Sequence, residues 1–347
     1  MNKTLITILL ATLGTSAFAK QYWVTGVNKN GGWVDQDKDR TPIYNEYGAG
    51  YFNNGPDGDG FLCWAASATD IITWWHDLNP GAQAMNPEAP HEQGQIWNLF
   101  KSNFINNSGS ASNGIEWYMN GLTTTANPTP KKPQPSPGDY YPDLELDVQH
   151  FDIREFDPRY IEDDGELIFY PDYEGVVGDI HLNIAKKITD MIRDGYIISL
   201  GISGITGSKH ATTLWGVETD EATGLLTKMW ITDSDDNLQG YGTGLIELDC
   251  TPIVNDLMVG PYKYGEQLAY GITSTGKAYA EEEFKDTKDG RLWYEYNLDS
   301  DPARNDYFYD FTAVKMPVVA YQGVPEPTTG TLSLLALAGL CARRRRK

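Results

Sequence analysis

The sequence predicts an α+β fold with a mainly helical first half and a sheet-forming second half. Apolar residues recur every three or four positions in several segments, which is the period of an amphipathic helix. Helices are predicted at residues 63–79, 91–103 and 114–122, with a further one at residues 179–194. Strand-like apolar or alternating runs follow at residues 196–202, 211–218 and 225–232. Helices and strands are therefore largely separate along the chain, as in the α+β class.

The composition is that of a folded, acidic protein. Of the 347 residues, 40% are hydrophobic and 12% are aromatic, which is enough to fill a core. The formal net charge is −21, and the basic cluster of the sequence lies in its last five residues. Nucleic acid is therefore not an expected partner. Six prolines between residues 127 and 142 predict a stiff surface insert rather than a domain boundary.

Both ends of the chain have the pattern of targeting segments. Residues 1–19 contain an early lysine, an apolar run and a final Ala-Phe-Ala, which is typical of a secretory signal peptide. Residues 324–347 contain Pro-Glu-Pro, a short apolar run and a basic cluster, in that order. This order resembles the PEP-CTERM sorting signal of exported bacterial proteins, whose tail is removed by a membrane protease. The mature protein is therefore expected to comprise residues 20–323 and to be secreted or displayed on the cell surface, with export and sorting machinery as partners.

Cys63 stands near the start of the first predicted helix. A thiol at a helix N-terminus lies at the positive end of the helix dipole, which favours the reactive thiolate. The free N–H groups there can also hold an oxyanion. Two other interpretations remain open. Cys63 could be a small buried hydrophobic residue, or it could form a disulfide with Cys250, because disulfides persist in exported proteins.

A predicted β-hairpin brings His210 close to two acidic residues. The two strands within residues 211–232 flank a turn-rich segment, which is the signature of a hairpin with a longer loop. In the expected register His210 faces residue 234 to within one position, so Asp233 and Asp235 lie on either side of that point. An aspartate there can bind one imidazole nitrogen and fix the tautomer. The alternative is a strand-end histidine beside an ordinary turn.

These three residue types in this order are the components of a papain-like thiol hydrolase. In such an enzyme a helical half carries the nucleophilic cysteine, and a sheet half carries the histidine base and its acidic partner. We therefore expect a papain-like cysteine protease fold, with the Cys63 helix packed on an antiparallel sheet. The other histidines have no acidic partner that the sequence can place, so they are expected to be structural.

Three blocks of sequence carry a resemblance to a known family. They are Gly32-Trp33-Val34-Asp35 with Lys38, Leu62-Cys63 through Trp74-Trp75, and His210 with Leu214-Trp215-Gly216 and Thr232-Asp233-Ser234-Asp235. These blocks resemble the streptococcal immunoglobulin G-degrading endopeptidases (IdeS/Mac family), which are papain-fold cysteine proteases. The family is specific for immunoglobulin G, so immunoglobulin is one candidate among extracellular protein substrates.

The resemblance also implies a role for each site residue. Cys63 would be the nucleophile, His210 the base and Asp233 the acid that orients it. Asp235 would be a secondary acidic member of the site. Lys38 would contribute to the oxyanion hole beside the backbone N–H of Cys63, and no cofactor is needed.

Two acidic loops support a different interpretation. Residues 35–39 and 233–237 are rich in aspartate, and oxygen-rich loops suit calcium. However, Arg40 and Leu238 stand where an EF-hand requires glycine. Calcium in these loops, together with a disulfide between the two mature cysteines, would describe a non-catalytic surface binding protein. A thiol acyltransferase using the same triad is a further alternative.

Overall fold

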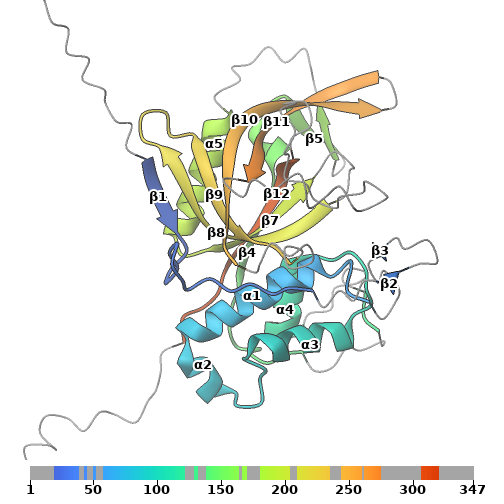
Figure 1. Cartoon of the computed structure of the whole chain (residues 1–347), viewed down its shortest axis with the longest axis vertical. Coiled ribbons are helices and arrows are strands. Elements are labelled where there is room, and N and C mark those ends of the chain that lie inside the picture. The colour runs from blue at the N-terminus through green and yellow to red at the C-terminus, as the bar shows by residue number, and fades with distance from the viewer. Residues whose placement is uncertain are drawn as a thin grey trace, which may run out of the picture.

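The computed structural model of the chain describes residues 19–38, 43–44, 50–51, 58–121, 129–131, 138–163, 166–169, 180–203, 209–234, 244–259, 262–274 and 306–319. The expected sorting tail, the expected signal peptide up to residue 18, and Asp235 lie outside these residues. The described part has an α+β fold, with a group of helices on one side and a large antiparallel sheet on the other (Figure 1). No helix in this part of the chain is both long enough and apolar enough to span a membrane.

Four helices form the helical half. They are α1 (Cys63–Leu78), α2 (Pro80–Met85), α3 (Gln93–Asn103) and α4 (Ala111–Asn120). Helix α1 is central, because every residue from Trp64 to His76 is buried. Helix α2 follows α1 almost directly, and Pro80 occupies its first position, where the missing N–H of proline costs nothing.

The two adjacent tryptophans of α1 fix the helix to distant parts of the chain. Trp74 Nε1 donates a hydrogen bond to the carbonyl of Thr25 at 2.9 Å, and Trp75 Nε1 donates to the carbonyl of Pro317 at 2.7 Å. Both indole rings are buried, so these bonds satisfy donors that would otherwise be costly to remove from water. The helix that begins at Cys63 is therefore held by both ends of the described chain.

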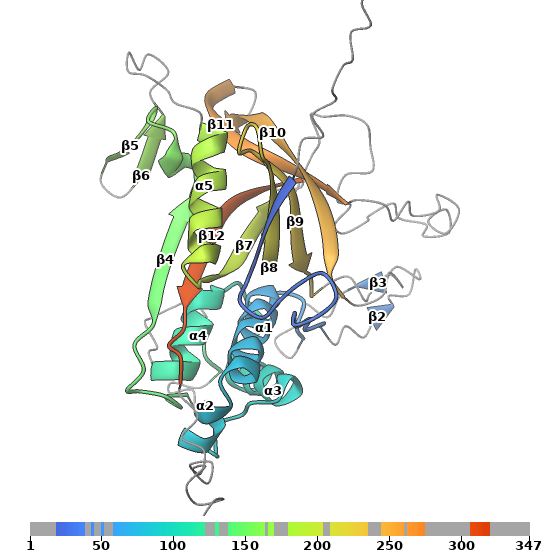
Figure 2. The same ribbon diagram turned by 90° about the vertical axis from the view of Figure 1, so that its left-hand side faces the viewer.

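The sheet half consists of eight antiparallel strands. The strand order is β1 (Ala19–Trp23), β8 (Lys209–Asp220), β7 (Ile197–Ser203), β12 (Asp306–Lys315), β11 (Tyr262–Ser274), β10 (Ile246–Val259) and β9 (Leu226–Thr232), with β4 (Asp147–Asp152) paired to β12. Strand β9 also pairs with β8, so six of the strands form a closed ring. Helix α5 (Ile180–Arg193) runs along this sheet (Figure 2).

The remaining described elements are short. They are the strand pairs β2 (Ile43–Tyr44) with β3 (Gly50–Tyr51) and β5 (Tyr160–Asp163) with β6 (Glu166–Phe169), and the 3-10 helix η1 (Ile153–Phe156). The proline-rich segment is only partly described. Residues 129–131 hydrogen-bond to the end of α3, and Tyr141 is buried in the core of the helical half. The expected surface insert thus ends inside the protein.

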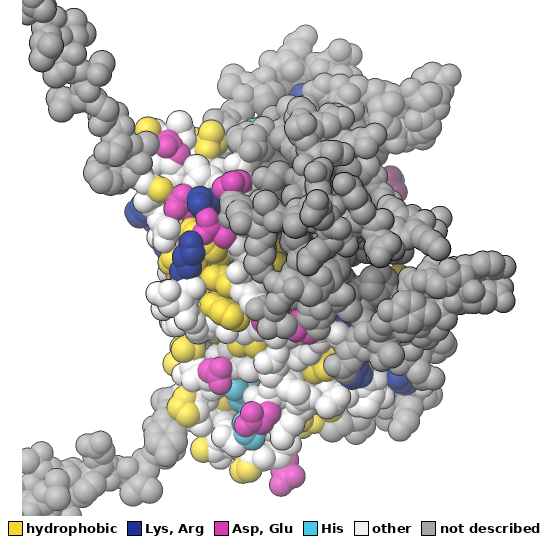
Figure 3. Space-filling view, viewed as in Figure 1, with side chains coloured by type: hydrophobic (Ala, Val, Ile, Leu, Met, Phe, Trp, Pro, Cys, Tyr) yellow, Lys and Arg dark blue, Asp and Glu magenta, His cyan; other side chains and the backbone are white. Residues whose placement is uncertain are grey.

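Strand β8 lies between two hydrophobic cores. Trp215 belongs to the core of the helical half, and its neighbour Leu214 belongs to the core between the sheet and α5. Successive side chains of a strand point to opposite faces, which explains this division. The β8–β9 hairpin forms as expected, but Thr213 pairs with Thr232, one residue beyond the expected register. Carboxylates are spread over the sheet half and the helical half of the face drawn in Figure 3, in keeping with the net charge of −21.

Candidate active site

The structure joins His210 and Asp233 in a buried hydrogen bond. His210 is the second residue of β8, and Asp233 directly follows β9. The His210 Nε2 and Asp233 Oδ1 atoms are 2.6 Å apart, and each side chain is only 2% exposed. Because an ionised carboxylate can only accept, Nε2 carries the proton in this contact. The tautomer of His210 is thereby fixed, and Nδ1 is left for another partner.

Cys63 is that partner. It is the first residue of α1, its thiol is free and half-buried, and it hydrogen-bonds to the imidazole of His210. Burial raises the pKa of the Cys63 thiol, but the hydrogen bond and charge of His210, the charge of Lys38 and the backbone of Ala211 lower it more. The resulting pKa is about 7, below the usual value of 9.0. A substantial fraction of Cys63 is therefore thiolate near neutral pH.

The N-terminus of α1 is open to the site. No side chain caps this helix, and its first turn contains no acidic residue. The leading N–H groups of a helix have no partner within the helix, and they form the positive end of its dipole. The preceding loop is held in place, since Phe61 N donates to Asn106 Oδ1 at 2.7 Å and Leu62 N donates to the carbonyl of Asp59 at 2.9 Å. Donors suited to an oxyanion therefore stand beside the thiol.

Lys38 is placed beside these residues although it lies 25 positions before Cys63 in the sequence. Its side chain is almost fully buried, and Nζ donates to the carbonyl of Gly60 at 3.2 Å. Its backbone N–H donates to the carbonyl of Ser234 at 3.0 Å. Lys38 thus contacts both the loop before Cys63 and the residue after Asp233, and its charge lowers the pKa of the thiol.

Asp235, the second acidic residue expected at the site, lies outside the described residues. The structure instead shows another carboxyl near the site. Burial raises the pKa of Asp35 to about 8, with further contributions from Asp37 and Asp233, although the backbone of Gly244 opposes the change. Within the described chain, neither carboxylate oxygen of Asp35 accepts a hydrogen bond of ordinary geometry. The carboxylate oxygens of Asp35 are therefore buried, and the negative charge of Asp233 contributes to its raised pKa.

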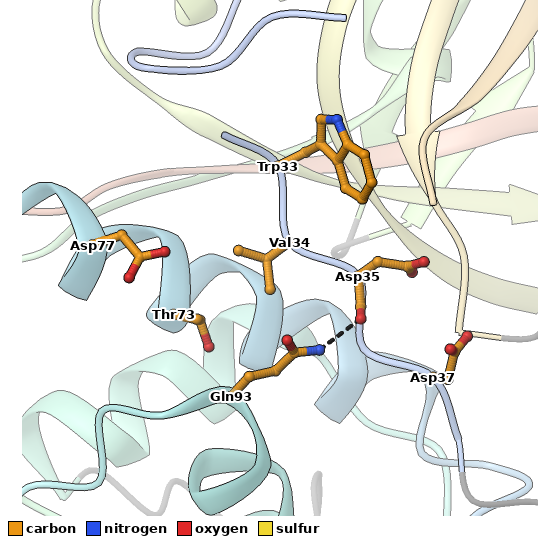
Figure 4. A pocket seen from close by; sticks show the side chains of 7 residues that line it. All are labelled: Trp33, Val34, Asp35, Asp37, Thr73, Asp77 and Gln93. Carbon is orange, nitrogen blue, oxygen red and sulfur yellow. Dashed lines mark hydrogen bonds between the residues drawn. The ribbon is translucent and has the colours of Figure 1, made fainter. Parts of the chain in front are cut away.

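A pocket of about 370 Å³ lies next to this acid, along α1 (Figure 4). Its lining residues are Trp33, Val34, Asp35, Asp37, Thr73, Asp77 and Gln93. Gln93, at the start of α3, donates to the backbone carbonyl of Asp35 at 2.6 Å, and this bond ties the segment before Lys38 to the helical half. The lining contains three acids and no basic side chain.

One residue beside the triad was not predicted from the sequence. Asp70 is 3% exposed within α1, and it hydrogen-bonds to the two strands that carry the histidine and its acid. The available signal was a carboxyl seven positions after Cys63 in the same predicted helix. A spacing of seven residues places both side chains on the same face of a helix.

Two elements of the alternative interpretation can be compared with the structure. Cys63 and Cys250 are both free thiols, so the disulfide between them is absent. Cys250 is buried in the core under α5, and burial raises the pKa of its thiol. Among the described residues, no group of three or more His, Cys, Asp or Glu side chains is arranged to hold a metal ion. Asp39 and residues 235–237 of the two acidic loops lie outside that part of the chain.

Two of the other histidines have different surroundings. Burial lowers the pKa of His76 to about 4, and its Nε2 lies 2.8 Å from the hydroxyl of Tyr118. His150 Nδ1 lies 3.0 Å from the hydroxyl of Thr312. Neither histidine is in contact with Cys63, so His210 is the histidine that the structure places at the thiol.

Comparison with known proteins adds no family to this description. No family model matches the chain, and no curated protein matches it. The geometry of the site and the sequence motifs therefore carry the functional assignment.

Proposed function

We propose that the chain is an exported cysteine endopeptidase that hydrolyses peptide bonds of extracellular proteins. One observation carries the proposal. The Cys63 thiol, at the open N-terminus of α1, contacts the imidazole of His210, whose other nitrogen is bound to the buried Asp233. A nucleophile, its base and the group that orients the base are thus in the order that nucleophilic catalysis requires.

The chemistry follows from these positions. His210 takes the proton of Cys63, and the thiolate attacks the peptide carbonyl carbon. The oxyanion accepts hydrogen bonds from the N–H groups at the start of α1, and the charge of Lys38 stabilises it. The intermediate collapses to a thioester as protonated His210 gives its proton to the leaving amine. His210 then removes a proton from water as the water oxygen attacks the thioester carbonyl carbon. The C–S bond breaks to release the carboxylic acid, and protonated His210 returns its proton to the Cys63 thiolate.

The arrangement of the two halves supports a papain-like architecture. The thiol comes from a helix of the helical half, and the histidine and aspartate come from adjacent strands of an antiparallel sheet. The three motifs that resemble the IdeS/Mac endopeptidases lie at one place, since Lys38 contacts Gly60 and Ser234. This resemblance makes immunoglobulin a candidate substrate. The N-terminal signal pattern and the C-terminal sorting pattern support secretion or surface display.

The first experiment requires no knowledge of the substrate. The rate of alkylation of Cys63 by iodoacetamide is measured from pH 5 to pH 10 in the wild type and in His210→Ala. The proposal predicts fast alkylation that persists well below the free-thiol pKa of ~8.5 in the wild type and is lost in the variant. A thiol that titrates near the free value in both proteins would exclude the protease.

A second measurement separates hydrolysis from acyl transfer. Fluorescein-labelled casein is incubated with the protein in the presence and absence of glycine amide, and the new C-termini of the fragments are identified by mass spectrometry. Hydrolysis leaves free carboxylates even with the amine present. Fragments that end predominantly in the added amine would instead assign a thiol acyltransferase.

A further inference from the structure

One face of α1 is in polar contact with the sheet along two turns. Cys63, Ser67 and Asp70 are spaced by four and three residues, so they lie on the same face of the helix. Ser67 Oγ donates to the carbonyl of Thr212 at 3.3 Å and contacts Ser199 Oγ at 3.0 Å. The helix that carries the nucleophile therefore reaches the sheet through a buried polar strip rather than through apolar packing alone.

Asp70 makes the most specific contacts of this strip. Its Oδ2 atom accepts a hydrogen bond from Thr213 Oγ1 at 3.0 Å and a second one from Thr232 Oγ1 at 3.1 Å. Thr213 lies in β8, three residues after His210, and Thr232 is the last residue of β9, directly before Asp233. One carboxylate oxygen thus joins α1 to both strands that supply the rest of the triad.

The direction of the hydrogen bond between Thr232 and Asp70 follows from a neighbouring side chain. Trp215 Nε1 lies 2.8 Å from Thr232 Oγ1, and an indole N–H can only donate. Thr232 Oγ1 accepts this hydrogen bond, so its own hydroxyl donates to Asp70 Oδ2. All three side chains are at most 3% exposed. Water is excluded, so a broken bond would leave a buried polar group unpaired, which makes alternative positions of the helix costly.

We propose that Asp70 is a positioning residue for the triad, holding α1 against β8 and β9 so that the Cys63 thiol stays within hydrogen-bonding distance of His210. The inference rests on the proposed function. Asp70 does not touch the thiol or the imidazole; it acts through the backbones of the helix and the two strands. A helix that slides or tilts against the strands breaks the Asp70 bonds and the Cys63–His210 contact together.

The test compares four variants of the full chain. Asp70→Ala removes both hydrogen bonds, and Thr232→Val removes one of them at nearly constant volume. Asp70→Asn keeps an acceptor oxygen and replaces the carboxyl group by a neutral amide. Asn79→Ala is the matched control, because Asn79 is also a buried polar residue at α1, where it binds the carbonyl of Trp75 and the backbone N–H of Val319 at its other end.

The readouts are the melting temperature and the iodoacetamide pH profile of Cys63. We expect Asp70→Ala and Thr232→Val to raise the thiol pKa by about one unit, which lowers the alkylation rate at pH 6 about tenfold. Asp70→Asn is expected to retain most of the wild-type profile. Asn79→Ala is expected to lower the melting temperature and leave the profile unchanged.

The outcomes separate the inference from the proposed function. A wild-type thiol that titrates near pH 8.5 would contradict the protease, and the positioning role would fall with it. A depressed wild-type pKa that persists in Asp70→Ala and Thr232→Val, even with a lower melting temperature, would overturn the positioning role alone. A profile that shifts equally in Asn79→Ala would also overturn it, because general loosening of α1 would then be the cause.

Discussion

His210 Nε2 and Asp233 Oδ1 lie 2.6 Å apart in a site where each side chain is 2% exposed. Hydrogen bonds to an ionised group are stronger than neutral ones, and exclusion of water strengthens them further. Asp233 therefore favours the imidazolium form of His210, and the imidazolium in turn favours the thiolate of Cys63. The reactivity of the thiol depends in this way on a residue that does not contact it.

The role of Asp233 can be tested with Asp233→Asn. The amide keeps the size of the side chain but loses the charge, and it can hold the imidazole in the wrong tautomer. We expect the rate of casein hydrolysis to fall by about 10²–10⁴-fold, with a rise in the pKa of Cys63. Asp143→Asn, at an exposed carboxyl away from the site, is the control. Activity within threefold of the wild type would show that Asp233 does not orient the base.

The two cysteines are expected to differ strongly in reactivity. The pKa of Cys63 is about 7, so its alkylation rate should rise with pH and reach half its maximum near pH 7. Burial raises the pKa of Cys250, so this thiol should be inert in the folded protein. In mature Cys63→Ser (residues 20–323, which lack Cys341), native protein should therefore incorporate no label, and protein unfolded in guanidinium chloride should incorporate it at Cys250. Labelling of native Cys63→Ser would contradict this assignment.

Lys38 is expected to act on the transition state more than on binding. Lys38→Met keeps most of the buried aliphatic stem and removes the charge. Because the positive charge stabilises both the thiolate and the oxyanion, we expect kcat to fall by roughly 10–10²-fold with a small change in KM, and the thiol pKa to rise. The exposed Lys20 provides the control Lys20→Met. A change confined to KM would instead assign Lys38 to substrate binding.

Asp35 is expected to make the stability of the protein depend on pH. Its pKa is about 8 in the folded protein and about 4 in an unfolded chain. Between these values the folded state holds the proton more tightly, so the contribution of Asp35 to stability is present below about pH 4 and is lost as the pH rises towards 8. Asp35→Asn should therefore raise the melting temperature little at pH 4 and more at pH 8.

The matched control for Asp35→Asn is Glu88→Gln, at an exposed carboxylate. Its melting temperature should follow that of the wild type at every pH. An increase for Asp35→Asn that is the same at pH 4 and pH 8 would show that the carboxyl titrates normally in the folded protein.

Features that depend on local sequence were predictable. The apolar period of α1 predicted a helix headed by Cys63, and the structure begins α1 at that residue. The turn residues between β8 and β9 predicted the hairpin, and pairing across a hairpin is a short-range relationship. His210 and Asp233 could therefore be paired from sequence spacing, even though the register differs by one residue.

Other features were decided only by the tertiary structure. Strand β12 was not predicted, and its pairings to β4 and β7 depend on packing between segments far apart in the sequence. Strands β10 and β11 were not predicted either, although they are neighbours in the sequence and pair with each other. The position of Lys38 at the site depends on two contacts, with Gly60 and Ser234, that lie far apart in the sequence.

Asp70 is the clearest example of a residue whose role could not be predicted from the sequence. In the sequence it is one of several polar residues of this helix, and its spacing of seven from Cys63 indicates only that the two side chains share a helix face. Its partners Thr213 and Thr232 are 143 and 162 positions away. Local sequence was enough to predict the helix, the hairpin and the order of the candidate site residues, because backbone propensity and side-chain period act over a few neighbouring residues. Burial against distant strands decided which polar residues support them, because hydrogen-bond partners are chosen only when the two halves pack together.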